Sequence, residues 1–170
     1  MPTITDQLYK TANKDLRRFL QGPISSYDNL RNFDFGADDR RNVSCLSKYI
    51  SHRVLIEYDI ITQSMALHRY DDVEKFVQEV FWRVYWKGWL EHRPTVWDDF
   101  ISFDLSNVSN FNYQNAIKGE TGIRCFDSWV NELQDRNYLH NHTRMWFASI
   151  WIFTLGLPWQ LGARFFMHHL

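Results

Sequence analysis

The sequence has few of the features that mark disulfide-rich, zinc-binding or strongly basic proteins. Only two cysteines occur among 170 residues, Cys45 and Cys125, and neither has the C-x-x-C spacing of a zinc or redox site. We therefore interpret both as reduced, structural thiols. The net charge is −1, from 19 basic and 20 acidic side chains, so the whole-chain charge of a dedicated nucleic-acid-binding protein is absent. A local basic patch is compatible with that balance.

The chain also lacks a long apolar run. Its most apolar stretch, residues 145–157, is much shorter than the roughly 20 residues that span a bilayer, so it predicts a buried core helix. The N-terminus has no basic segment followed by an apolar one, which argues against a secretory signal. We expect a cytoplasmic protein with no membrane partner.

Aromatic residues, in contrast, are abundant. Hydrophobic residues make up 45% of the chain and charged ones 23%, as in a soluble globular domain, but aromatic residues reach 17%. Such side chains bury large areas, and they also suit proteins that stack flat rings or carry electrons. Core packing alone is the simpler interpretation until motifs are considered.

Hydrophobic spacing predicts an all-α fold, with no β alternation and no internal repeat. Turn residues and capping residues set the expected boundaries. The expected helices cover residues 5–21, 44 or 47 to 58, 71 to about 89, a segment carrying Phe126 to Leu133, 141–155 with Asn141 or Thr143 as its cap, and 158 to the end. The expected loops cover residues 24–43, 92–115, 119–122 and 136–139.

Two short motifs follow the first expected helix. The first is Tyr27-Asp-Asn-Leu-Arg31, and the second is Val43-Ser-Cys-Leu-Ser47. A helix beginning at the second motif would offer unpaired N–H groups, so Ser44 and Ser47 would hold an anion without a basic side chain. Ordinary helix capping by the same two serines is the alternative.

The third motif, Phe76-Val-Gln-Glu-Val-Phe-Trp-Arg-Val-Tyr-Trp86, is the most specific one in the chain. Helical spacing places Glu79, Trp82 and Arg83 on or beside one face. Glu79 and Arg83 are four residues apart and opposite in charge, so a salt bridge within the helix explains that pair equally well. We expect Trp86 and Trp89 to be structural.

A fourth motif runs from Gly119-Glu-Thr-Gly122 through Phe126-Asp127 to Leu139-His-Asn-His-Thr-Arg-Met145, and it continues to Gly162-Ala-Arg-Phe-Phe-Met167. His140 and His142 do not indicate a metal pair or an HNH nuclease, because neighbours two apart on a helix diverge and no further ligand cluster is evident. We expect no metal site.

In order and approximate spacing, the four motifs resemble the all-helical FAD-binding domain of the DNA photolyase and cryptochrome family, over about residues 5–170. The resemblance implies one helical region, residues 1–170, with FAD as cofactor. It also implies that the domain is incomplete at its C-terminal end and that the α/β antenna domain is absent.

The resemblance implies roles for individual residues. FAD contacts are expected from Tyr27, Val43, Ser44, Cys45, Leu46, Ser47, Phe76, Arg83, Asn141 and Arg144. DNA contacts are expected from Arg31, Glu79, Trp82, Asn141 and His142, with Glu79 and Trp82 holding a pyrimidine dimer. Trp159 matches the middle member of the family's electron relay, whereas Ala116 stands where the outer tryptophan usually is.

Three functions stay open from the sequence. The first is light-driven repair of pyrimidine dimers by reduced FAD. The second is a flavin-binding or light-sensing module without repair, or half of a split protein. The third is an inactive fragment. An incomplete domain would expose Trp151, Phe153, Phe165 and Phe166, and would favour self-association or a complementary polypeptide.

Overall fold

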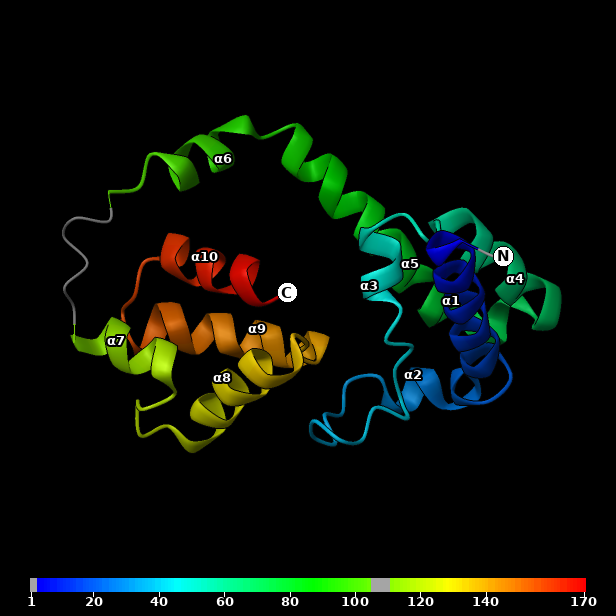
Figure 1. Ribbon diagram of the computed structural model, residues 1–170, viewed down its shortest axis with the longest axis horizontal. Coiled ribbons are helices and arrows are strands. Elements are labelled where there is room, and N and C mark those ends of the chain that lie inside the picture. Colours follow the sequence, from blue (N-terminus) through cyan, green and yellow to red (C-terminus); the bar gives the residue numbers. More distant parts are fainter. Residues whose placement is uncertain (1–2, 105–110) are drawn as a thin grey trace. The chain divides into compact units, whose positions relative to one another are not determined.

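The computed structural model describes residues 3–104 and 111–170, and it divides the chain into two compact units, residues 1–92 and 93–170 (Figure 1). No strand occurs in the described part, so the all-α prediction is confirmed. None of the described helices combines the length and the apolar character needed to cross a bilayer.

The first unit is built around two long helices, α1 and α5. The elements are α1 (Ile4–Leu20), the 3-10 turn η1 (Pro23–Ser26), α2 (Tyr27–Leu30), α3 (Ser47–Ser51), α4 (Glu57–Leu67) and α5 (Tyr70–Glu91). Helix α1 begins with a capping box, because Thr3 accepts from the backbone of Asp6 while the Asp6 carboxylate accepts from the backbone of Thr3. The predicted helices over 5–21 and 71–89 are confirmed.

The core of this unit lies between one face of α1 and the first half of α5. Helix α1 buries Ala12, Leu16, Phe19 and Leu20. Helix α5 buries Val73, Phe76, Val77 and Val80, all within its first three turns. The second half of α5 contributes no buried residue, although it is rich in aromatic side chains. This contrast along one helix positions the candidate site.

The second unit packs its helices around a dense aromatic core. Its elements are α6 (Pro94–Ile101), α7 (Phe111–Lys118), α8 (Arg124–Arg136), α9 (Asn141–Ser149), the π-helical turn η2 (Ile150–Thr154) and α10 (Trp159–His169). Phe126 and Phe147 stack with ring centroids 4.4 Å apart, and Trp151 and Phe165 pack against the same rings. The predicted helices around Phe126, from Asn141 and after Pro158 are confirmed.

The expected second helix is wrong. Instead of one helix through Tyr58, a five-residue α3 ends at Ser51, and α4 begins at Glu57. Arg53 adopts a left-handed conformation with φ 58°, and the N–H groups of Val54 and Leu55 both donate to the carbonyl of Tyr49. The chain therefore turns sharply where the apolar spacing alone predicted continuation.

The expected loop over 92–115 is also wrong, since it contains α6 and the start of α7. Pro94 occupies the first turn of α6, a position where its missing N–H costs no hydrogen bond. The part of that loop from 105 to 110 lies outside the described residues. At the start of α9 the cap is His140 rather than Asn141 or Thr143, because its Nδ1 accepts from the N–H of His142 at 3.2 Å.

The expected exposure of apolar residues near the C-terminus is largely wrong. Trp151 is 1% exposed and Phe165 8% exposed, and Phe166 is half-buried against the core. Of the four residues, only Phe153 is exposed, at 82%. Trp151 and Phe165 are thus buried in the core of the second unit itself, among side chains of α8, α9, η2 and α10.

Candidate functional site

Tyr27 lies in an aromatic cluster formed by three elements of the first unit. Its ring meets Phe19 of α1 edge-on at 5.7 Å and Phe76 of α5 edge-on at 5.4 Å. Burial raises the pKa of the Tyr27 hydroxyl far above its usual value, and the Glu79 carboxylate raises the pKa further. The hydroxyl therefore stays protonated and is available as a hydrogen-bond donor. Two predicted FAD-contact residues, Tyr27 and Phe76, are thus adjacent.

Arg31 connects the end of α2 with the exposed face of α5. Its Nη1 donates to the backbone carbonyl of Asp28 and, at 2.8 Å, to the carboxylate of Asp28. Its Nε lies 3.8 Å from Oε1 of Glu79. The structure therefore brings together two residues that the resemblance assigned to DNA contact, although they are far apart in the sequence.

The salt bridge expected between Glu79 and Arg83 does not form. Arg83 instead donates from Nη2 to the hydroxyl of Ser51, at the end of α3, at 2.5 Å. Among the ion pairs of the described residues, Glu79 has only Arg31 as a partner. Spacing along one helix predicted the wrong pair, because a residue from another element reaches Glu79 and a hydroxyl reaches Arg83.

The segment from Val43 to Ser47 adopts a turn followed by the short helix α3. Leu46 is buried and occupies the capping position, so the prediction that Ser44 or Ser47 caps this helix is wrong. Cys45 has a left-handed backbone with φ 52°. The N–H groups of Tyr49 and Ile50 both donate to the carbonyl of Leu46. A helix of five residues adds little dipole, so anion binding here depends on local N–H and hydroxyl groups.

Asn42, which the sequence motifs did not single out, holds this segment in place. Its Nδ2 donates at 2.7 Å to the carbonyl of Leu30 and at 2.7 Å to that of Phe33. The side chain is 1% exposed, and its Oδ1 has no hydrogen-bond partner among the described residues. Asn42 thereby ties the Val43–Ser47 segment to the end of α2. Its only sequence signal is its position immediately before the second motif.

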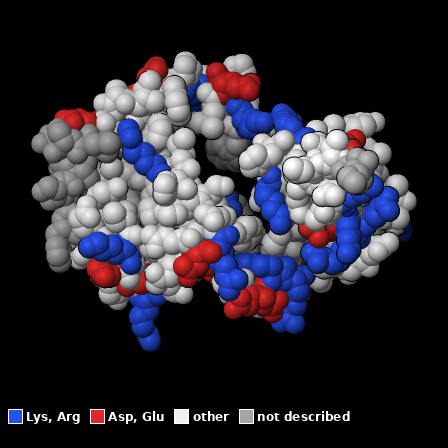
Figure 2. Space-filling model, viewed as in Figure 1, with Lys and Arg blue, Asp and Glu red and all other residues white. Residues whose placement is uncertain are grey.

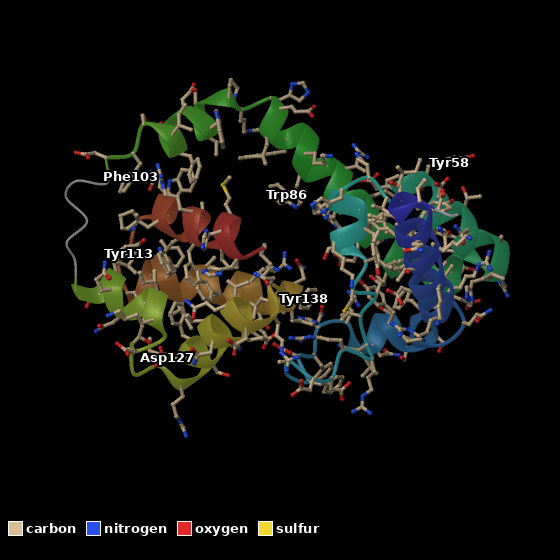
Figure 3. All side chains as sticks on the ribbon, in the orientation of Figure 1. Tyr58, Trp86, Phe103, Tyr113, Asp127 and Tyr138 are labelled. Carbon is tan, nitrogen blue, oxygen red and sulfur yellow. The ribbon has the colours of Figure 1, made fainter. Side chains whose placement is uncertain are left out.

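The second half of α5 carries a row of rings in contact with one another, here called the α5 aromatic row: Trp82, Tyr85, Trp86 and Trp89. Trp82 and Trp86 stack at 6.3 Å, and Trp86 meets Trp89 at 5.6 Å. Trp82 is 49% exposed and Trp86, labelled in Figure 3, is 52% exposed. Trp86 therefore lies outside both hydrophobic core clusters, against the expectation that it is structural.

In the second unit, the predicted site residues at the start of α9 differ in what they contact. Asn141 is exposed in the first turn. Arg144 donates from Nε to the carbonyl of Leu139 at 2.8 Å, and its guanidinium lies 5.7 Å from the ring centre of Tyr138 (Figure 3). The His142 ring meets Trp146 edge-on at 5.3 Å. Arg144 thus stabilises the turn between α8 and α9, whereas Asn141 faces solvent.

The residues at the two relay positions, Trp159 and Ala116, differ in burial. Trp159 is 37% exposed and stacks on Phe100 of α6 at 6.2 Å. Ala116 is fully buried in the core of the second unit. Trp151 is buried too, and its indole Nε1 donates to the carbonyl of Pro158 at 3.0 Å. Within the described residues, the ring neighbour of Trp159 is therefore a phenylalanine.

The turn before α8 is organised by a single carboxylate. Asp127, labelled in Figure 3, accepts from the N–H and the hydroxyl of Thr121 at 2.9 and 2.7 Å, and from the N–H of Gly122 at 3.0 Å. A carboxylate in the first turn of a helix is also favoured by the helix dipole. The Gly119–Gly122 turn and Asp127 of the fourth motif are therefore explained by folding as well as by the resemblance.

The residues of the first unit fit a bound anionic cofactor. The Nε of Arg31 is buried and lacks a hydrogen-bond partner among the described residues, so it has a donor to offer. Arg31 lies near Tyr27 and Glu79, and guanidinium groups bind phosphate strongly. The described residues contain no group of three His, Cys, Asp or Glu side chains that would hold a metal ion.

Comparison with known proteins defines the class. Residues 76–170 match the family described as the FAD binding domain of DNA photolyase. The deoxyribodipyrimidine photo-lyase of Neurospora crassa is 30% identical over 105 residues, which are 59% of this chain and 17% of that protein. The enzyme of the same name from Escherichia coli is 26% identical over 170 residues, covering 95% of this chain and 35% of the relative.

A solved structure shows the same fold. A bacterial class III photolyase from Agrobacterium tumefaciens aligns with a TM-score of 0.79 and 23% identity, over 100% of this chain and 38% of that one. The fold and the matched region define an all-helical flavoprotein domain. The chain belongs to the family of the FAD binding domain of DNA photolyase, and FAD is the cofactor of that family. It spans about a third of the length of the Escherichia coli relative.

Proposed function

We propose that this chain forms the flavin-binding region of a deoxyribodipyrimidine photolyase, which repairs pyrimidine dimers in DNA with light. The observation that carries the proposal is the exposed face of α5, where Glu79 and Trp82 lie three residues apart and Arg31 pairs with Glu79. The Glu79 carboxylate accepts hydrogen bonds, so it suits the ring N–H of a pyrimidine. The Trp82 ring offers a stacking surface for the same base.

The proposed roles divide between binding and positioning. Tyr27 and Arg31 donate to the anionic or polar edge of FAD, and Arg83 supports the cofactor from the same side of α5. Glu79 and Trp82 orient the dimer, while Arg31, whose Nε lies 3.8 Å from Oε1 of Glu79, directs that carboxylate. The chemistry that FAD supplies, when it is bound and reduced, is light-driven electron donation.

A repair assay tests this proposal. The full chain with reduced FAD is illuminated in the presence of an oligonucleotide carrying one cyclobutane pyrimidine dimer, and intact thymines are counted afterwards. We expect repair by the wild type, and a large loss in Glu79→Gln, which keeps the shape of the side chain but removes its charge. Flavin binding without any repair would favour the second candidate, a cryptochrome-like flavin module. A folded protein that binds no flavin would contradict both.

We also propose that the chain works together with further protein, either a second copy or a complementary polypeptide. Exposed apolar side chains support this: Phe81, Tyr85 and Leu90 on α5 are each more than half exposed, as is Phe153. Light scattering over a concentration series tests it. A monomeric mass at every concentration, with no change on adding the rest of a photolyase, would contradict it.

A further inference from the structure

The polar face of α1 concentrates positive charge on a chain whose net charge is −1. Lys10, Lys14 and Arg17 recur at spacings of four and three, so they lie on one side of the helix. All three are exposed. Figure 2 shows Lys and Arg side chains gathered over α1. This α1 basic stripe, defined by the three residues, is outside the site described above.

The α1 basic stripe lines an open pocket of about 1020 Å³. Arg18 joins the stripe in the lining, and Gly22 and Pro23 close the end of the pocket where α1 stops. No Asp or Glu is among the lining residues. The lining therefore carries four cationic side chains beside neutral ones, and the pocket is large enough for phosphate groups and the sugars between them.

The charges of the stripe are not neutralised within the protein. Among the ion pairs of the described residues, none includes Lys10, Lys14 or Arg17. Two carboxylates of α1 lie near the stripe, and both have other partners. Asp6, four residues before Lys10, accepts from the backbone N–H and the hydroxyl of Thr3 at 2.9 Å. Asp15, next to Lys14, is engaged by Arg18 at 3.4 Å and by the hydroxyl of Tyr49 at 2.7 Å. Like charges four residues apart destabilise a helix, so folding alone does not account for Lys10 beside Lys14.

Two simpler explanations fail on the geometry. Cations in the last turn favour the helix dipole, which accounts for Arg17 and Arg18, but Lys10 and Lys14 lie further from that end. A basic amphipathic helix that lies on a membrane needs a free apolar face. The apolar face of α1 is fully used, because Ala12, Leu16 and Leu20 are buried in the core of the unit.

We propose that the α1 basic stripe binds the phosphate backbone of duplex DNA, independently of any lesion and of FAD. Seven residues of helix rise about 10 Å, which corresponds to about three base pairs along a duplex. Three cations spread over that length can each reach a phosphate within about three base pairs of one strand. Tyr9, half exposed beside the stripe, and the backbone around Gly22 complete a surface without base readout. The role goes beyond dimer repair, because it needs neither Glu79 nor Trp82.

The test measures binding of an undamaged 20-base-pair duplex by the full chain, in the dark and without FAD, over a range of salt concentrations. The variant Lys10→Gln/Arg17→Gln removes two contacts, so the slope of log K against log salt should fall by about 1.8. The matched control is Lys118→Gln/Arg124→Gln, which removes one lysine and one arginine from the second unit. We expect the control to keep the wild-type slope.

Other results would overturn the proposal. An equal fall of the slope in the control would mean that only the overall charge matters. An unchanged slope in the α1 variant, or no duplex binding by the wild type, would exclude the stripe as a DNA surface. Binding of the wild type to vesicles of anionic lipid, lost in the α1 variant while duplex binding persists, would reassign the stripe to membranes. Because the probe carries no lesion, failure of dimer repair leaves this result unaffected.

Discussion

The Nε of Arg31 lies 3.8 Å from Oε1 of Glu79, so the carboxylate at the candidate site is held by a residue 48 positions earlier in the chain. The Glu79 side chain is 42% exposed, and a pair this exposed contributes little to folding. We predict that Glu79→Gln lowers the free energy of unfolding by less than about 1 kcal/mol. Urea unfolding checks this. A loss above about 3 kcal/mol would instead make the pair structural.

Trp82 should contribute to lesion binding through stacking rather than through folding. We predict that Trp82→Ala weakens binding of a dimer-containing oligonucleotide by about 1 to 3 kcal/mol, while the melting temperature stays near the wild-type value. Fluorescence anisotropy measures the binding. Trp97→Ala is the matched control, since Trp97 is similarly exposed, at 56%, and lies on α6. Equal losses in both variants would remove Trp82 from the site.

Tyr49 should make folding sensitive to alkaline pH. Burial, together with the hydrogen bond that its hydroxyl donates to Asp15, raises the pKa of Tyr49 to about 12. Because the pKa is higher in the folded state, the protonated hydroxyl stabilises the fold. This stabilisation is complete below pH 10, the ordinary pKa of tyrosine, and is lost as the pH rises through 12. Tyr49→Phe should lower the free energy of unfolding by about 1.5 to 3 kcal/mol at pH 8. It should also reduce the fall of that free energy at alkaline pH.

The control for Tyr49 is Tyr58→Phe, because Tyr58 is 74% exposed on α4. In chemical denaturation, the free energy of unfolding of the Tyr58→Phe variant should follow that of the wild type from pH 8 to pH 12. Burial raises the pKa of Tyr27 as well. Tyr49→Phe should therefore still lose some stability at alkaline pH, through Tyr27. The same fall in the free energy of unfolding above pH 10 in Tyr49→Phe and in the wild type would contradict the role given to Tyr49.

Two helical glycines should respond in opposite ways to alanine. A Cβ at Gly162 would come within 3.1 Å of Nε1 of the buried Trp151, so Gly162→Ala should lower the free energy of unfolding by about 1 to 3 kcal/mol. A Cβ at Gly88 of α5 meets nothing within 4 Å, so Gly88→Ala should raise it by up to about 1 kcal/mol. Denaturant midpoints compare the two. The same sign in both variants would refute the close packing at Trp151.

Much of the helical frame could be predicted from the sequence, because apolar spacing and caps report local structure. Helices α1, α5 and α8 follow directly from such spacing, and the start of α10 follows from Pro158. Helix α6 was missed, since its eight residues are too few to establish an apolar period, and α3 was extended too far because nothing in the sequence marked the left-handed Arg53. A left-handed non-glycine residue depends on tertiary contacts that local patterns do not record.

The candidate site could be predicted as a set of residues but not as a set of contacts. The motifs gave Tyr27, Arg31 and Glu79, whereas the pairing of Arg31 with Glu79 depends on how α2 packs against α5. Asn42 was missed for the same reason, because its role rests on two carbonyls brought near it by the loop. The burial of Trp151 and Phe165 was missed because η2 and α10 fold back onto α9.

The central claim is that the residues of this chain hold FAD, and binding of the flavin itself tests it most directly. The purified chain is mixed with FAD and separated by gel filtration while flavin absorbance is followed, with Arg83→Ala and Arg31→Ala in parallel. The account predicts that flavin elutes with the wild-type protein and that both variants retain less of it. A folded, colourless wild-type protein, with all the flavin eluting as the free molecule, would contradict it.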